Sequence, residues 1–117
     1  MKRWLPVVLL AALIFYGSSI PGNELHVPFN LWDKLLHATE YAIFAFLLAR
    51  AFGVRRWWWA IIAGTLYGVS DEFHQTFTPN RNGNDPGDML ADLIGSSLGT
   101  LAFYGFHRFG RRAKTAA

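Results

Sequence analysis

The sequence contains no cysteine, which excludes a disulfide framework, a thiolate metal site and a thiol nucleophile. Charge is also scarce: 16% of the residues are charged, against about 25% in an average soluble domain. Hydrophobic residues make up 52% of the chain, with five Trp and ten Phe among 117 residues. This length suits one domain, 1–117. The composition therefore points away from an ordinary soluble fold.

The first long run without charge extends from Trp4 to Asn23. As a helix rising about 1.5 Å per residue, this run would cover the roughly 30 Å hydrocarbon core of a bilayer. A cleaved signal peptide is the alternative. However, the segment YGSSIPG is a poor match to a small-x-small cleavage site, so we expect a retained span.

Three more apolar stretches follow, and the sequence predicts spans at roughly 4–22, 33–52, 57–77 and 88–109. The charge-free part of each of the last two is only about 21 Å of helix, which is too short to cross a bilayer alone. These stretches are therefore either core helices of a soluble bundle or membrane helices whose polar ends are sheltered by their neighbours.

Charge placement favours the membrane alternative. With four spans and both termini in the cytoplasm, nine of the eleven basic residues lie inside, as the positive-inside rule requires. They are Lys2, Arg3, Arg50, Arg55, Arg56, Arg108, Arg111, Arg112 and Lys114. All eight acids fall in the outer half: Glu24, Asp33, Glu40, Asp71, Glu72, Asp85, Asp88 and Asp92. A soluble bundle has no reason to sort its charges in this way, so we predict an all-α, four-span transmembrane bundle.

Polar and small residues share one face on each of the last three spans, because a helix turns about 100° per residue. The second span carries Asp33, His37, Glu40 and Phe44, with Tyr41 beside them. The third carries Gly64, Gly68, Asp71 and Gln75, with Glu72 beside them, and the fourth carries Asp88, Asp92, Gly95 and Gly99. Glycines four residues apart let membrane helices approach closely. The acids therefore point into the bundle, and we expect an outward-opening polar pocket between these spans.

His37 and Glu72 are the strongest candidates for chemistry, because neither lies at a helix N-terminus, where a carboxylate would be favoured. Together with Asp88 they supply the residue types for general acid/base catalysis, or for a His/carboxylate site that holds a divalent metal ion. The sequence has no HExxH and no GxSxG motif, so no recognised catalytic motif supports an enzyme.

Several other polar residues have a structural explanation beside a ligand-binding one. Asp85 before Pro86 is typical of a helix N-cap, and Asp33 and Asp88 suit first turns. Lys34 either snorkels to the headgroups or contacts a ligand.

Tyr41, Gln75 and Asp92 either bind a ligand or join helices by hydrogen bonds. Arg81 either pairs with a carboxylate of the site or binds a substrate phosphate or carboxylate. Asp71 and His74 either point into the pocket or face the headgroups.

Three segments together resemble the VanZ-like family: DKLLHATEY with His37 and Tyr41, EFHQTFTPNR with Glu72, Gln75 and Arg81, and DMLADLIGSSLG with Asp88, Gly95 and Gly99. The segment SSIP, residues 18–21, is similar to the one after that family's first span. The family usually has Asn where this chain has Asp92.

The resemblance implies a small bacterial integral membrane protein. The charge placement would then put its polar pocket on the extracytoplasmic side of the inner membrane. The naming member contributes to resistance against teicoplanin, a glycopeptide with a lipid tail. The resemblance assigns no biochemical activity and does not make this chain a resistance determinant.

Three functions remain open. The pocket could bind an amphiphile of the cell envelope, such as a lipid-linked intermediate or a cationic lipopeptide, since its acids favour positive ligands or metals. The protein could instead be a hydrolase or transferase acting on a lipid headgroup, with a divalent metal as possible cofactor. It could also be a structural or assembly protein. The expected partner is the lipid bilayer, with no nucleic acid, and the sequence does not indicate an oligomeric state.

Overall fold

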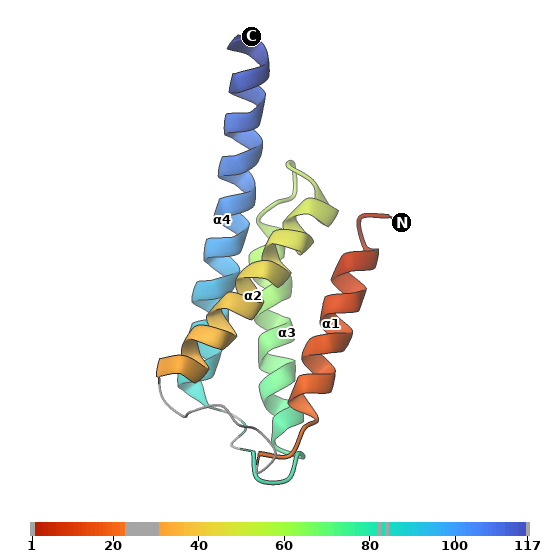
Figure 1. The fold of residues 1–117 in the computed structure, drawn as a ribbon, viewed down its shortest axis with the longest axis vertical. Helices are drawn as coiled ribbons and strands as arrows, with labels where there is room; N and C mark the ends of the chain where they lie inside the picture. The colour runs from red at the N-terminus through yellow and green to blue at the C-terminus, as the bar shows by residue number, and fades with distance from the viewer. Residues whose placement is uncertain (1, 23–30, 82, 84, 117) are drawn as a thin grey trace.

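The computed structural model describes residues 2–22, 31–81, 83 and 85–116. This part of the chain forms four α-helices and no strand: α1 (Leu5–Ser18), α2 (Leu31–Phe52), α3 (Trp59–Gln75) and α4 (Pro86–Ala116). Consecutive helices run in opposite directions, so both termini lie at the same end of the bundle (Figure 1). The all-α prediction is confirmed. Glu24 and most of the first predicted outer loop lie outside the described residues.

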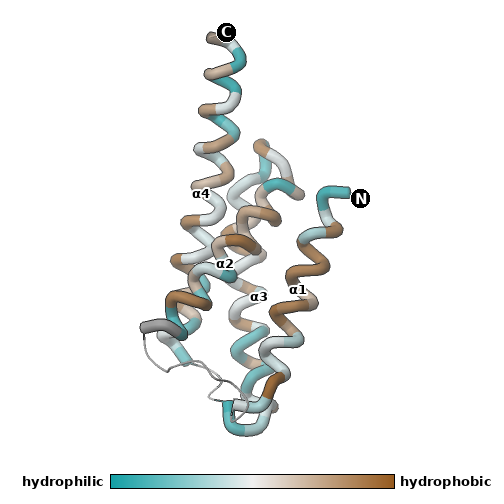
Figure 2. Tube along the Cα trace, in the orientation of Figure 1, coloured by the Kyte–Doolittle hydropathy of each residue, from teal (hydrophilic) through white to brown (hydrophobic). Residues whose placement is uncertain are grey.

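The two ends of the bundle differ in chemistry. The polar end is where α1 and α3 finish and α2 and α4 begin. The basic end is the opposite one, where both termini lie (Figure 1). Figure 2 shows that α1 is hydrophobic over most of its length, whereas the hydrophilic residues of α3 gather toward the polar end.

The helix α1 is shorter than the predicted span 4–22, because it ends at Ser18. Its fourteen residues are about 21 Å long. Pro21 explains the early end, since a proline disfavours helical geometry in the residue before it, here Ile20. The side chain of Thr78 donates a hydrogen bond to the carbonyl oxygen of Ser18 over 2.8 Å, satisfying one of the free acceptors at this helix end.

The helix α4 begins as predicted and continues further than predicted. The carboxylate of Asp85 accepts a hydrogen bond of 2.8 Å from the Gly87 backbone N–H, which confirms Asp85 as the N-cap before Pro86. The helix then runs on to Ala116 rather than to about residue 109. Arg, Ala and Lys dominate this extension and are strong helix formers, and the basic side chains suit a helix C-terminus.

Glycines set the spacing between the helices, as their four-residue spacing predicts. A Cβ added at Gly95 would lie 2.2 Å from the carbonyl oxygen of Ala38, and one at Gly99 would lie 1.9 Å from that of Ala42. The backbones of α2 and α4 therefore touch at these two points. This contact brings the polar faces of the two helices together at the polar end.

The apolar core is small, and much apolar surface is exposed. The buried core residues are Val7, Ile14, Tyr41, Phe44, Leu48, Ala49 and Ala60. Leu5, Val8, Leu9 and Leu13 of α1 are among the many large hydrophobic side chains on the surface. Within the described residues, two helices are long and apolar enough to cross a membrane: α2 from Asp33 to Phe52, and α4.

Candidate functional site

His37 lies at the centre of the polar end, between carboxylates from two helices. Its Nδ1 atom is 3.2 Å from Oδ1 of Asp92 on α4. Its Nε2 atom is 3.9 Å from Oδ1 of Asp33 on α2 and 3.9 Å from Oδ2 of Asp88 on α4. The contact between α2 and α4 at Gly95 brings these groups this close. The ring of His37 thus lies between the buried carboxylate of Asp92 on one side and those of the buried Asp88 and the partly exposed Asp33 on the other.

Glu72 of α3 completes the buried part of the site. Its side chain is fully buried, and its Oε2 accepts a 3.2 Å hydrogen bond from the backbone N–H of Asp85. The other oxygen, Oε1, has no hydrogen-bond partner among the described residues, and the same is true of Oδ2 of Asp92. Buried polar atoms are nearly always satisfied in folded proteins. Two unsatisfied carboxylate oxygens in one place therefore require an explanation.

In the structure, the three predicted metal-binding residues, His37, Glu72 and Asp88, fall into two groups. His37, Glu72 and Asp92 each offer a ligand atom within 4.8 Å of the others, and all three are buried. Asp33, His37 and Asp88 form a second such group, nearer the surface. Some of the predicted site residues from each of the three helices therefore come together, with His37 shared by both groups and Asp92, rather than Asp88, grouped with Glu72.

Gly68 makes room for Asp92. A Cβ added at Gly68 would lie 2.8 Å from Oδ2 of Asp92 and 2.9 Å from its Cβ. Any larger residue on α3 would therefore press on the carboxylate. The glycine pair on α3 thus lets α4 place Asp92 beside Glu72.

The comparison with known families fits these observations. A family model described as VanZ/LLP1 matches residues 3–107. The chain belongs to the VanZ/LLP1 family. No curated protein and no solved structure gives a significant match to it. The motif residues of the resemblance, including His37, Glu72 and Asp88, lie at the polar end of this VanZ-like protein.

Lys34 joins the starts of α2 and α4. Its ammonium donates to Oδ2 of Asp85 over 2.8 Å and to Oδ1 of Asp88 over 2.5 Å. The hydrogen bond from Lys34 lowers the pKa of the Asp85 carboxyl below its usual value. Lys34 is therefore occupied by two acids of the VanZ-like chain itself, and Asp88 has a structural partner as well as its place near His37.

A second polar cluster connects α1, α2 and α3 around Asp71. Ser18 donates a hydrogen bond to Asp71, as do Tyr41 over 3.3 Å and Gln75 over 3.4 Å. Asp71 is buried, as its place on the inward face of α3 predicts, so the alternative in which it faces the headgroups is wrong. Three donors satisfy its carboxylate, which makes this cluster a junction between helices.

His74 also contacts α1, since its ring stacks on Phe15 with centroids 4.4 Å apart and its Nε2 lies 3.0 Å from Oγ of Ser19. The sequence suggested no such contact.

Arg81 has a role that the sequence did not suggest. Its guanidinium donates hydrogen bonds of 3.2 Å to the carbonyl oxygens of Gly17 and Ile20. These carbonyls lie at the C-terminal end of α1, where the helix dipole attracts a positive charge. Arg81 therefore fastens the first helix of this VanZ-like protein to the loop after α3.

Proposed function

We propose that this VanZ-like protein is a single domain that crosses the bacterial cell membrane four times, with both termini in the cytoplasm. The exposed apolar side chains of α1 support this, because soluble monomers rarely expose large contiguous apolar surfaces. The helices α1 and α3 are about 21 and 26 Å long, short for a bilayer. Local thinning of the bilayer and interfacial Trp residues accommodate such short spans.

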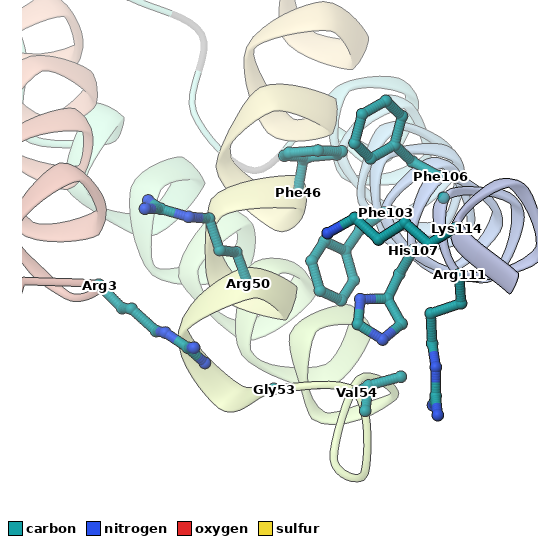
Figure 3. A pocket seen from close by; sticks show the side chains of 11 residues that line it. Arg3, Phe46, Arg50, Gly53, Val54, Phe103, Phe106, His107, Arg111 and Lys114 are labelled. Carbon is teal, nitrogen blue, oxygen red and sulfur yellow. The ribbon is translucent and has the colours of Figure 1, made fainter. Parts of the chain in front are cut away.

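The basic end supports the proposed orientation. A cavity of about 870 Å³ lies there, with Arg3, Arg50, Arg111 and Lys114 among the residues that line it (Figure 3). Basic residues at the ends of spans favour the cytoplasmic side, where they also meet anionic lipids. The polar end, with its carboxylates, then faces the outside of the cell.

Cysteine labelling tests this orientation, because the natural chain has no cysteine. We expect a cysteine from Thr76→Cys, at the exposed end of α3, to react with a membrane-impermeant maleimide added to intact cells. A cysteine from Arg112→Cys should react only after the cells are broken. The reverse pattern would refute the orientation.

We propose further that the polar end binds the positively charged part of an amphiphilic cell-envelope compound at the outer leaflet. The observation that carries this proposal is the excess of carboxylates over free cations there. Lys34 is already paired with Asp85 and Asp88, and Arg81 contacts backbone carbonyls. Asp33 and Asp85 remain partly exposed, with 35% and 38% of their side-chain surface accessible, and form the rim that a ligand would meet. A contribution to the response to lipid-tailed glycopeptide antibiotics would follow from such binding.

Binding of a fluorescent cationic lipopeptide to the protein in nanodiscs tests this function. A contact to a charged group is worth about 1.5–3 kcal/mol, so we expect Asp33→Asn to weaken binding at least about tenfold. Arg111→Gln, at the opposite end, should leave the affinity unchanged. Equal affinity of Asp33→Asn and the unmodified protein would refute the site.

Glu72→Gln distinguishes a functional polar end from a structural one. We expect this variant to be folded and inserted in the membrane but unable to bind the lipopeptide. Loss of insertion or of stability would favour the structural or assembly role instead.

A membrane-embedded hydrolase or transferase acting on a lipid headgroup is the second candidate. It is favoured by the pairing of His37 with Asp92 over 3.2 Å, since a carboxylate that orients an imidazole is typical of a general base. Release of phosphate from a lipid pyrophosphate in proteoliposomes would test it. Turnover by the unmodified protein that is lost in His37→Ala would support the enzyme, and no turnover would exclude this reaction.

A further inference from the structure

The buried cluster of His37, Glu72 and Asp92 has too many acceptors for the donors around it. Glu72 is 0% exposed and Asp92 is 1% exposed, yet each keeps one oxygen without a hydrogen-bond partner among the described residues. Leaving a buried acceptor unsatisfied costs about 1–3 kcal/mol, and more for a charged group. The Asp71 carboxylate, which has three donors, shows that the same fold satisfies a buried acid when the acid only joins helices.

The charges of the cluster are also unbalanced. Two carboxylates bring two negative charges, and the nearby Lys34 and Arg81 are engaged elsewhere. A protonated His37 would offset only one of the two charges. A divalent cation would offset both and would accept the two unpartnered oxygens as ligands.

The two nitrogens of His37 suit a metal ligand with outer support. Nδ1 faces Asp92 over 3.2 Å, while Nε2 lies 3.9 Å from both Asp33 and Asp88. A histidine that binds a metal through one nitrogen usually donates its other N–H to a carboxylate, which fixes the ring. Asp33 and Asp88 lie on the Nε2 side of the ring, and at 3.9 Å either would have to move closer to accept that hydrogen bond.

We propose that His37, Glu72 and Asp92 bind one divalent first-row transition metal ion, of the class of Zn²⁺ or Mn²⁺. Imidazole suits Zn²⁺, carboxylates suit Mn²⁺, and a set of one imidazole and two carboxylates is hard enough for either ion. Ligand bonds to zinc are about 2.0–2.2 Å, which places neighbouring ligand atoms about 3.4 Å apart around a tetrahedral ion. The ligand atoms that His37, Glu72 and Asp92 offer lie within 4.8 Å of one another, so small movements would bring them to this spacing.

The proposed ion is distinct from the amphiphilic ligand, because it is held by the chain's own side chains and forms part of the site. Three protein ligands leave a coordination position for water or for a phosphate oxygen. An ion at this position would therefore also let the acidic polar end accept an anionic headgroup.

Metal analysis of the full chain tests the proposal. The protein is purified in detergent with a tag that contains no histidine, stripped with EDTA, incubated with Zn²⁺ or Mn²⁺, and freed of unbound metal. We expect one ion per chain in the unmodified protein. Glu72→Gln and Asp92→Asn, which keep the size of the side chain, should hold almost none. Asp33→Asn should bind about 10–100-fold more weakly, as expected for loss of an outer partner.

Controls separate this site from adventitious binding and from misfolding. His74→Gln and His107→Gln remove histidines outside the cluster and should leave the stoichiometry unchanged. Zn²⁺ or Mn²⁺ should also raise the unfolding midpoint of the unmodified protein, by mass action on the folded state, and should not raise that of Asp92→Asn. Helical circular dichroism confirms that each variant is folded. A folded, unmodified protein that takes up neither ion would overturn the proposal. A metal content in Glu72→Gln or Asp92→Asn equal to that of the unmodified protein would also overturn it.

Discussion

Alanine at Gly99 should force α4 away from α2. A Cβ at this position would lie 1.9 Å from the carbonyl oxygen of Ala42 and 2.6 Å from its carbonyl carbon. Carbon and oxygen atoms approach to about 3.3 Å in the closest favourable contacts between helices. The backbones would therefore have to separate by about 1.4 Å, the difference between the two carbon–oxygen distances.

The magnitude follows from two opposing effects. Overpacking of this kind costs about 1–3 kcal/mol, and a backbone neighbour cannot rotate away as a side chain can. Alanine also gains about 0.8–1.0 kcal/mol over glycine in a helix interior. We therefore expect Gly99→Ala to lower the free energy of unfolding by up to about 2 kcal/mol. Gly105→Ala is the matched control on the same helix, because nothing lies within 4 Å of a Cβ there. It should be neutral or stabilising.

The assay is equilibrium unfolding of the purified protein in mixed micelles, with SDS as denaturant and far-ultraviolet circular dichroism as readout. Gly95→Ala provides a second test, since its Cβ would lie 2.2 Å from the carbonyl oxygen of Ala38. A Gly99→Ala protein as stable as the Gly105→Ala protein would refute the close contact between α2 and α4.

Two further predictions concern the loop between α3 and α4. Asp85→Asn keeps an N-cap acceptor for Gly87 but removes the charge facing Lys34, so at neutral pH it should lower the free energy of unfolding by less than about 1 kcal/mol. Because Lys34 lowers the pKa of Asp85 below its usual 3.8, this stabilisation is present above pH 3.8 and is lost as the pH falls through the lowered value. A difference from the unmodified protein that persists unchanged below that pH would contradict the ion pair. Arg81→Gln should accelerate amide hydrogen exchange in the last turn of α1, since hydrogen bonds from a charged donor are worth about 1.5–3 kcal/mol. Unchanged exchange at Gly17 would exclude that anchoring role.

The helices and their contact faces were predictable from the sequence. The four-residue glycine spacing correctly placed Gly95 and Gly99 against a neighbouring helix, and the order Asp85–Pro86 correctly marked the start of α4. Both signals are local, since they depend on residues within one or two turns. The helix α4 continues past residue 109, where the predicted span ends, because arginine, alanine and lysine favour helix.

The partners of the acids were not predictable in the same way. Helical periodicity shows that Asp71 and Glu72 point about 100° apart, but it does not show which neighbour each one meets. In the structure Asp71 faces Ser18 of α1 and Glu72 faces the start of α4. The contacts of Arg81 depend on the path of a turn-rich loop, which helical periodicity does not predict. Only the three-dimensional contacts therefore show that the carboxylate of Asp71 has three hydrogen-bond donors, whereas Glu72 and Asp92 each keep an oxygen without a partner among the described residues.

The fastening of α1 has a consequence for how the chain is made. Ser18 is held by Asp71 and Thr78, and Gly17 by Arg81, which follow 53 to 64 residues later in the sequence. The first helix is therefore synthesised long before its anchors leave the ribosome. A nascent chain stopped before residue 71 would contain the hydrophobic helix α1 without the side chains that hydrogen-bond to its last turn. These contacts can form only after α3 and the following loop have been synthesised.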